Sequence, residues 1–396
     1  MSFLKLSSFI SLFSRISSNG QFMKEIDGLR FIAIMPVLIF HISGYIRERF
    51  SGGMALLDYQ TWWGNLIKNG SNGVELFFGI SGFILSWPML CREDLISRNF
   101  LGQFYLRRLT RLEPPYLIAM TLFAGLLILR MAPPTKTLQS LGASSVYLHN
   151  FFYGRPSTIN VVTWTLEIEF QYYLLAPILV YLLKKLAFKV RLFILPLLIS
   201  TLSLLNLVHR QELLYLLPFL HFFLAGVFAA DLYLHVRWNS LRPNMAVWSG
   251  WVWLLLLFTF FSIDFRRSPM EHLVFSVTLV LLLLFSLNLP SLISKNFLTN
   301  PLVFLIGGMC YSIYLLHYPI ISIVGQAMLA WNIPIGIFFI STLIIILIAS
   351  ACFFLIVEKP TMIKGWYKQS LKQVYKTVFS TSKIIYNEIN HRSPGI

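Results

Sequence analysis

Stretches of about 20 mainly apolar residues recur along the chain, and they constrain its fold more than any other feature. A helix of that length crosses the hydrocarbon core of a bilayer, and its backbone satisfies its own hydrogen bonds there. Ten such stretches lie near residues 29–46, 72–90, 114–130, 163–183, 190–208, 213–234, 246–263, 271–289, 302–329 and 333–357. The sequence therefore predicts an all-α, polytopic membrane protein with about ten transmembrane helices.

The composition excludes a soluble enzyme and a disordered chain, because 57% of the residues are hydrophobic and only 12% are charged. The 32 Lys and Arg outnumber the 16 Asp and Glu. In a membrane protein this excess indicates orientation charge and contact with anionic lipid or phosphorylated small molecules, so no nucleic-acid partner is expected. The three cysteines, Cys91, Cys310 and Cys352, lie in or beside apolar stretches and predict neither a disulfide framework nor a metal site.

The distribution of positive charge predicts the orientation. Connecting segments on the side shared by the two termini carry 22 Lys and Arg, and the opposite side carries nine. Cytoplasmic loops collect these residues, so both termini are expected in the cytoplasm. We predict an interfacial segment over 1–22, a transmembrane domain over 23–360 and a basic amphipathic tail over 361–396. The ninth stretch is long, which allows a kink or a re-entrant turn around Pro319.

Two ionisable residues of the first stretch, Arg30 and His41, are eleven positions apart. At about 100° per residue they fall within about 20° of one helix face. A guanidinium suits phosphate, and an imidazole can take a proton from a hydroxyl. The alternative is that Arg30 anchors the helix and His41 bonds a neighbouring helix. If the shared face is functional, a narrow channel should run along the residues between them on that face, namely Ile34, Val37 and Leu38.

Three arginines cluster ahead of the third stretch, at Arg107, Arg108 and Arg111. On a helix they occupy adjoining faces at the inner membrane surface and can grip a pyrophosphate. Positive-inside anchoring is the alternative. Pro114 and Pro115 follow, and they are expected to start the next helix, because proline is tolerated in a first turn.

Two carboxylates, Glu167 and Glu169, lie near the outer third of the fourth stretch and point about 200° apart. One of them can bond an Arg or Tyr structurally, or can orient an imidazole such as His41. His317 is expected at a similar depth, and Glu75 near the outer end of the second stretch. Ionisable residues within spans are functional candidates by default.

The order of these residues resembles the acyltransferase 3 family of integral-membrane acyltransferases, which includes O-acetylases of lipopolysaccharide O-antigen and peptidoglycan. The resemblance covers nearly the whole chain. It is carried by Asp27-Gly28-Leu29-Arg30 with His41, Gly73 to Phe78 with Ser81-Gly82-Phe83, Arg107-Arg108 with Arg111 and Pro114, Trp164-Thr165-Leu166 with Glu169 and Tyr173, Gly308 with Tyr311-Ser312, Tyr314 to Pro319, and Glu358-Lys359-Pro360. The chain departs from the usual pattern at Thr165, Cys310 and Glu113.

The resemblance implies transfer of an acyl group, usually acetyl from acetyl-CoA, to a hydroxyl of a cell-surface or lipid-linked carbohydrate, without a metal or a permanently bound cofactor. It favours the bacterial inner membrane. Combined with the residues above, it predicts His41 as general base, Glu169 as its orienting partner, and Arg30, Arg107, Arg108 and Arg111 as ligands of acyl-CoA. Substrate-binding candidates are Asp27, Glu75, Tyr173, Tyr314 and His317.

Other mechanisms and functions stay open at this point. The acyl group can pass directly to the acceptor or through an acyl-enzyme at His41 or at a serine such as Ser43 or Ser81. A transporter or flippase of anionic lipid-linked sugars would also use buried His, Glu and Arg, although transporters tend to have repeated halves and no repeat is found here. A catalytically inactive assembly subunit is a further alternative. The sequence does not fix the acceptor, the acyl chain length or the oligomeric state.

Overall fold

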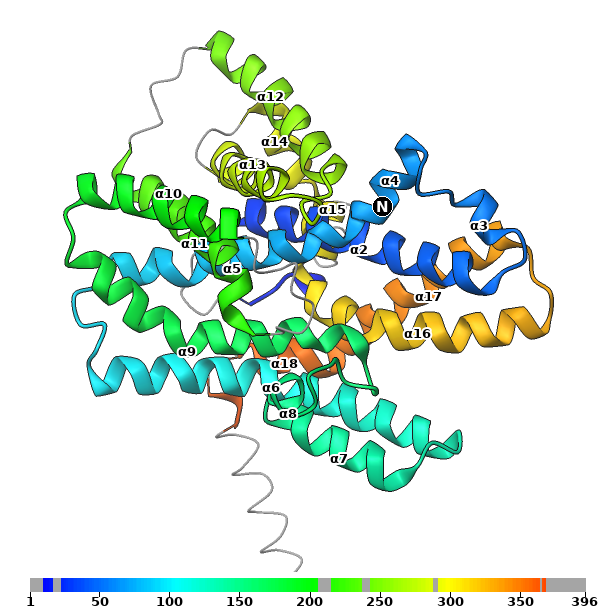
Figure 1. Cartoon of the computed structure of the whole chain (residues 1–396). Helices are drawn as coiled ribbons and strands as arrows, with labels where there is room; N and C mark the ends of the chain where they lie inside the picture. The colour runs from blue at the N-terminus through cyan, green and yellow to red at the C-terminus, as the bar shows by residue number, and fades with distance from the viewer. Residues whose placement is uncertain are drawn as a thin grey trace, which may run out of the picture.

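The computed structural model describes residues 10–16, 23–205, 215–236, 243–287, 291–363 and 365–367, and within these ranges it is built of helices without strands (Figure 1). The predicted all-α fold is confirmed. The helices are α2 (Lys24–Arg49), α3 (Gly53–Leu56), α4 (Trp62–Lys68), α5 (Gly73–Leu90), α6 (Arg98–Leu129), α7 (Pro134–Ser145), α8 (His149–Tyr153), α9 (Trp164–Lys184), α10 (Phe188–Leu205), α11 (Leu216–His235), α12 (Pro243–Ser262), α13 (Pro269–Leu287), α14 (Leu292–Leu298), α15 (Pro301–Gly308), α16 (Cys310–Ala330), α17 (Ile335–Phe353) and α18 (Lys359–Thr361). Short 3-10 turns at Asn69–Asn72 and Val161–Thr163 and a π-turn at Phe354–Glu358 complete them.

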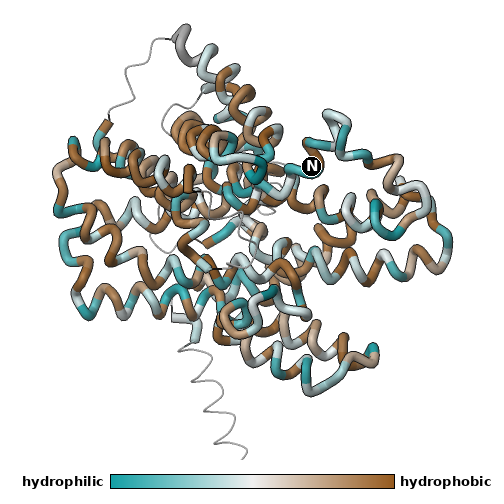
Figure 2. Tube along the Cα trace, viewed as in Figure 1, coloured by the Kyte–Doolittle hydropathy of each residue, from teal (hydrophilic) through white to brown (hydrophobic). Residues whose placement is uncertain are grey.

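Nine helical segments of the described chain are long and apolar enough to cross a membrane, and the apolar part of α12, Trp248–Ser262, is a shorter tenth. Together they correspond to the ten predicted stretches. Figure 2 shows hydrophobic residues along these helices and hydrophilic residues gathered at their ends. The turns after α5 and α9 lie at one end of the bundle, and the turns after α2 and α16 lie at the other (Figure 1). The chain is therefore a multi-pass integral membrane protein.

Helix α6 begins sixteen residues earlier than expected, at Arg98, and continues through Pro114 and Pro115. Proline cannot donate to the carbonyl four residues before it, which leaves the carbonyls of Thr110 and Arg111 without their usual partners. Side chains near the C-terminal end of the described chain replace them. The indole Nε1 of Trp366 donates to the Thr110 carbonyl at 2.9 Å, and the hydroxyl of Thr361 donates to the Arg111 carbonyl at 3.0 Å.

The predicted long ninth span is interrupted at Met309, between α15 and α16, whereas Pro319 lies within a continuous α16. The interruption follows two glycines and lies where α15 crosses α2. A Cβ on Gly307 would stand 1.7 Å from the Asp27 carbonyl oxygen, and one on Gly28 would stand 2.4 Å from the Leu298 carbonyl oxygen. Only glycine permits this approach, which brings the start of α2 against the start of α16.

The predicted end segments are described only in part. Residues 10–13 are helical, and Lys359 Nζ donates to the carbonyls of Ser11 at 2.9 Å and Leu12 at 2.5 Å. The remainder of the interfacial segment over 1–22, the tail beyond 367 and the span ends expected at 208, 213 and 289 lie outside the described residues.

Candidate functional site

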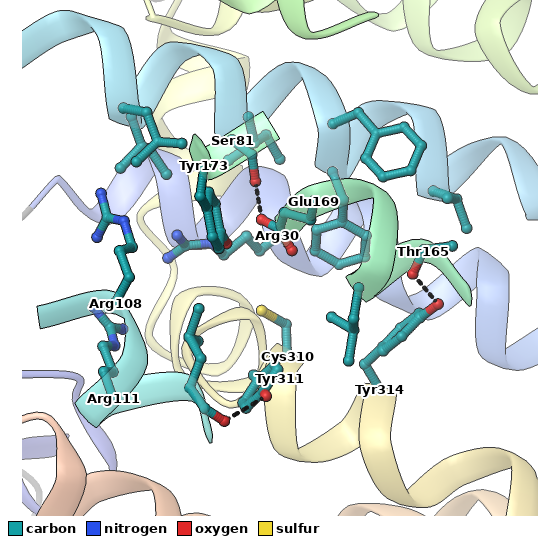
Figure 3. A pocket seen from close by; sticks show the side chains of 18 of the residues that line it. Arg30, Ser81, Arg108, Arg111, Thr165, Glu169, Tyr173, Cys310, Tyr311 and Tyr314 are labelled. Atoms are coloured by element: carbon teal, nitrogen blue, oxygen red, sulfur yellow. Dashed lines mark hydrogen bonds between the residues drawn. The ribbon is translucent and has the colours of Figure 1, made fainter. Parts of the chain in front are cut away.

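A pocket of about 160 Å³, called here the central pocket, lies among α2, α5, α6, α9 and α16. Figure 3 shows its side chains converging from these helices. Its lining is mixed, with apolar residues along α5 and charged residues from α2, α6 and α9. The charged and polar residues that line it are Arg15, Arg30, Ser81, Arg108, Arg111, Thr165, Glu169, Tyr173, Cys310, Tyr311, Tyr314 and Glu358.

Four guanidinium groups, those of Arg15, Arg30, Arg108 and Arg111, line the central pocket. Arg15 and Arg30 share one carboxylate oxygen, Oδ1 of Asp27, at 2.9 and 2.5 Å. Asp27 itself is almost completely buried. Asp27 does not line the pocket, but its Oδ1 holds two arginines that do. Its expected role in binding substrate stays a prediction.

Arg15 is a site residue that the sequence did not reveal. Its position in a polar N-terminal segment suggested orientation charge only, and no local motif marks it. The signal is a tertiary one. The carbonyls of Ser11 and Leu12 accept from Lys359, and this contact holds the segment against the bundle so that Arg15 reaches Asp27.

The arginine cluster of α6 divides between two spaces. Arg108 and Arg111 line the central pocket and also an entrance cavity of about 630 Å³, which Arg92 and Arg107 line as well. Arg107 donates to the Gln103 carbonyl of its own helix at 3.0 Å. The guanidinium of Arg108 lies 5.1 Å from the ring centre of Phe104 and 5.7 Å from that of Tyr173. Leu85, Arg108 and Arg111 line both spaces, so the two lie side by side and together form the candidate route described below.

Glu169 lies in the central pocket, as does Tyr173. Its Oε1 accepts a hydrogen bond of 2.5 Å from the Ser81 hydroxyl of α5, and its charge faces Arg108. The expected contact between Glu169 and His41 is not formed. The position of a residue along its span predicts its depth in the membrane but not which helix it faces. In the structure, Glu169 of α9 faces Ser81 of α5 and Arg108 of α6.

His41 has a different neighbour, the imidazole of His317 on α16. Their ring centroids are 5.1 Å apart, and the Tyr318 ring stands 5.4 Å from His41. Nδ1 of the fully buried His317 lies 2.8 Å from the Tyr314 carbonyl and 3.1 Å from the Ile313 carbonyl. Carbonyls only accept, so Nδ1 carries the proton. The buried Nε2, which has no hydrogen-bond partner among the described residues, then holds a free lone pair.

Tyr314 connects the histidine pair to the central pocket. Its ring lines the pocket and its centroid lies 5.6 Å from that of His317. Its hydroxyl donates to the Val162 carbonyl at 2.5 Å and lies 2.5 Å from the Thr165 hydroxyl. The sequence-predicted residues Tyr314 and His317 are thus brought together with His41. Neither His41 nor His317 lines the central pocket, and the Tyr314 ring lies between the pocket and His317.

Two further expectations are wrong. None of Ile34, Val37 and Leu38 lines the central pocket. Ile34 and Leu38 pack in a hydrophobic cluster, and Val37 lies against Gly73, so the route runs past α5, α6, α9 and α16 instead of along α2. Glu75 does not line the pocket either. It is buried in the first turn of α5 and pairs with Arg266 at 3.3 Å.

Comparison with known proteins identifies the family of the chain. A family model described as an acyltransferase domain matches residues 23–357. A Staphylococcus aureus (strain MRSA252) protein named "Putative O-acetyltransferase" is 23% identical, over 92% of this chain and 62% of its own length. "O-acetyltransferase OatA" of the same strain is 25% identical, over 92% of this chain and 61% of its own length.

The chain thus spans about three fifths of the length of these curated relatives. No solved structure matches it. The family model covers most of the residues on which the fold and the site depend, and the chain therefore belongs to the acyltransferase 3 family.

Proposed function

We propose that this protein is a membrane O-acyltransferase that moves an acyl group, in the first instance acetyl, from acyl-CoA to a hydroxyl of a cell-surface or lipid-linked carbohydrate. Family membership and the O-acetyltransferase names of the relatives support acyl transfer. They give no support to the transporter alternative. The choice of acyl-CoA as donor and the choice of catalytic residues rest on the arginine-lined cavities and on the histidine pair.

The observation that carries the proposal is the route formed by the entrance cavity and the central pocket. Arg92 and Arg107 line its wide part, Arg108 and Arg111 stand where the two spaces join, and Arg15 and Arg30 line the inner part. Guanidinium groups bind phosphate oxygens with charge-assisted hydrogen bonds. Coenzyme A has a phosphorylated nucleotide and a narrow pantetheine arm, and the route has the same order of wide cationic space followed by a narrow pocket.

The acceptor hydroxyl is proposed to react beside His41 and His317, which lie next to the pocket residue Tyr314 without lining the pocket themselves. His41 is assigned as general base, the role also expected from sequence. His317, with its fixed tautomer and free Nε2, takes the place of Glu169 as the residue that positions His41 and shares its proton. Glu169 and Ser81 instead fix the position of Arg108 and the donor.

The proposed step balances without a redox partner. The acceptor oxygen attacks the thioester carbonyl, its proton passes to His41, and the carbon–sulfur bond breaks as the ester forms. The thiolate then receives a proton, giving free coenzyme A. A covalent acyl-enzyme would divide this into two such steps, and the Ser81 hydroxyl, already bonded to Glu169, is the serine that lines the pocket beside the arginines.

The bacterial inner membrane is the proposed location, because acyl-CoA is a cytoplasmic donor and the arginine-lined cavity opens at the end of the bundle where Arg92 lies. The partners are then acyl-CoA, a carbohydrate or lipid-linked glycan acceptor and the bilayer.

The test compares surface glycan from cells that produce the wild-type protein, the His41→Gln variant or neither. The wild-type protein should raise the glycan mass by one acyl group per modified unit, and purified protein in liposomes should release free thiol from acetyl-CoA when acceptor is present. A change in glycan abundance without a change in glycan mass would contradict the proposal and favour transport.

A further inference from the structure

A lateral crevice of about 280 Å³ lies between α6 and α9, beside the central pocket. One face of each helix forms it. On α6 the lining residues include Tyr105, Leu109 and Glu113, and on α9 they include Phe170 and Leu174. The spacing of four residues along each helix is that of a continuous stripe, so the crevice runs along the helices as a slot.

The slot has closed ends and an apolar side. The Tyr105 hydroxyl donates to the Leu174 carbonyl at 3.1 Å and bridges the two helices at one end. At the other end the rings of Tyr147 and Phe170 stack at 4.7 Å. Leu109 and Leu174 are 44% and 48% exposed on membrane-spanning helices, where the surrounding medium is hydrocarbon. The open side of the crevice is therefore lined by leucines, and its two ends are bridged by Tyr105 and by the Tyr147–Phe170 pair.

The inner wall of the crevice is the wall of the central pocket. Leu112, Leu166 and Tyr311 line both spaces, and so do Arg108, Glu169 and Tyr173. Only these shared side chains separate a group in the central pocket from the crevice, and Leu112 and Leu166 form the apolar part of that wall. The end of a lipid chain that entered from the bilayer would be apolar and would meet the charged Arg108 and Glu169. An acyl chain of the donor would instead have its polar thioester group at that end and its apolar end towards the bilayer.

We propose that the crevice binds the hydrocarbon chain of the donor's acyl group, and that the protein accepts acyl groups longer than acetyl. This inference depends on the proposed function and specifies its donor. An apolar protein cavity of about 150 Å³ binds benzene, with six carbon atoms. On that scale the 280 Å³ of the crevice has room for about ten carbon atoms.

Glu113 is the charged residue of the crevice that does not also line the central pocket. Its carboxyl group forms a hydrogen bond with Tyr147, but its buried Oε2 has no hydrogen-bond partner among the described residues. Burial of an unpaired carboxyl oxygen against hydrocarbon is unfavourable. Replacement by leucine should therefore improve binding of long chains, the opposite of the effect of filling the slot.

The test measures kcat/KM of purified protein in liposomes with acetyl-, butyryl-, hexanoyl-, octanoyl- and decanoyl-CoA. For the wild-type protein, each buried methylene should strengthen binding by about threefold to fourfold until the slot is full. Leu109→Trp and Leu174→Trp should lower kcat/KM at least tenfold for octanoyl-CoA and leave it within about twofold for acetyl-CoA. Leu122→Trp is the matched control, because Leu122 is an exposed leucine of α6 outside the crevice.

Three results would overturn the inference. The first is that the wild-type protein uses acetyl-CoA alone. The second is that the two tryptophan variants lower kcat/KM equally for all donors, which would indicate a lipid-filled or purely structural slot. The third is that Glu113→Leu does not raise kcat/KM for octanoyl-CoA. Activity with acetyl-CoA distinguishes these from a failure of the proposed function, for which no acyl-CoA of any length would be used.

Discussion

His41 on α2 and His317 on α16 place their imidazole centroids 5.1 Å apart. The backbone carbonyls of Ile313 and Tyr314 fix the proton on Nδ1 of His317, so the pair has one defined hydrogen-bond acceptor at Nε2. Two imidazoles in contact within a membrane-spanning bundle are a costly arrangement for structure alone. This arrangement supports a shared role in moving a proton.

We expect His41→Gln to lower acyl transfer by about 10²- to 10⁴-fold, the range for loss of a general base. His317→Gln should lower it as well, since the second ring then no longer offers Nε2. The measurement is release of free thiol from acetyl-CoA with acceptor present. Thermal unfolding of each variant checks that it is folded, and His235→Gln, a change at the end of α11, should keep the wild-type rate. Wild-type turnover in His41→Gln would rule out the general-base role.

Replacement of the α6 arginines should distinguish those that line both spaces, Arg108 and Arg111, from Arg107, which lines only the entrance cavity. Arg108→Gln and Arg111→Gln should each weaken binding of acetyl-CoA by roughly tenfold or more, because charge-assisted hydrogen bonds contribute about 1.5 to 3 kcal/mol each. Arg107→Gln should have a smaller effect, since Arg107 lines only the entrance cavity and bonds its own helix. Isothermal titration at several salt concentrations measures this. If none of the three substitutions weakens acetyl-CoA binding and the membrane topology changes instead, the arginines serve only to anchor the helix at the membrane surface.

Arg15→Gln tests a residue that its local sequence did not mark. Loss of its guanidinium should weaken acetyl-CoA binding severalfold while the protein still inserts. Arg98→Gln is the matched control, because Arg98 is an exposed arginine at the start of α6 and lines neither space. If Arg15→Gln and Arg98→Gln behave alike, Arg15 contributes no more than general positive charge.

The capping of α6 by distant side chains predicts a rescue. Trp366→Phe removes the donor to the half-buried Thr110 carbonyl and should lower stability by about 0.5 to 1.5 kcal/mol, the usual net contribution of one hydrogen bond. Pro114→Ala supplies a backbone N–H for the same carbonyl. The double variant should therefore recover part of the lost stability, measured by thermal unfolding in detergent. Additive losses in the double variant would show that the indole does not serve this carbonyl.

The sequence predicted the number and position of the spans well, because runs of apolar residues near 20 in length have few other uses. It misplaced the start of α6, because proline favours the first turn of a helix and the side chains that compensate at Thr361 and Trp366 lie about 250 positions further along the chain. Arg15 and Asp27 are only 12 positions apart, but no local pattern predicts their pairing, because the segment that carries Arg15 is held in place by the distant Lys359.

The sequence indicated many of the residues that line the central pocket, but not which of them are in contact with one another. Arg30, Arg108, Arg111, Glu169, Tyr173 and Tyr314 all line the central pocket. Helix periodicity and depth cannot say which face meets which neighbour, so Glu169 was assigned to His41 although it bonds Ser81. Glu75 was expected at the substrate and instead pairs with Arg266.

Asp27 has a consequence for the energetics of loading. Its single Oδ1 serves as internal counter-ion to two guanidinium groups, so these cations are partly neutralised before any anion arrives. In the proposed function, Arg15 and Arg30 line the inner part of the route, which the uncharged pantetheine arm would occupy. Their pairing with Asp27 would leave less uncompensated positive charge beside that arm, so the phosphates of the donor would be held further out, at Arg107, Arg108 and Arg111.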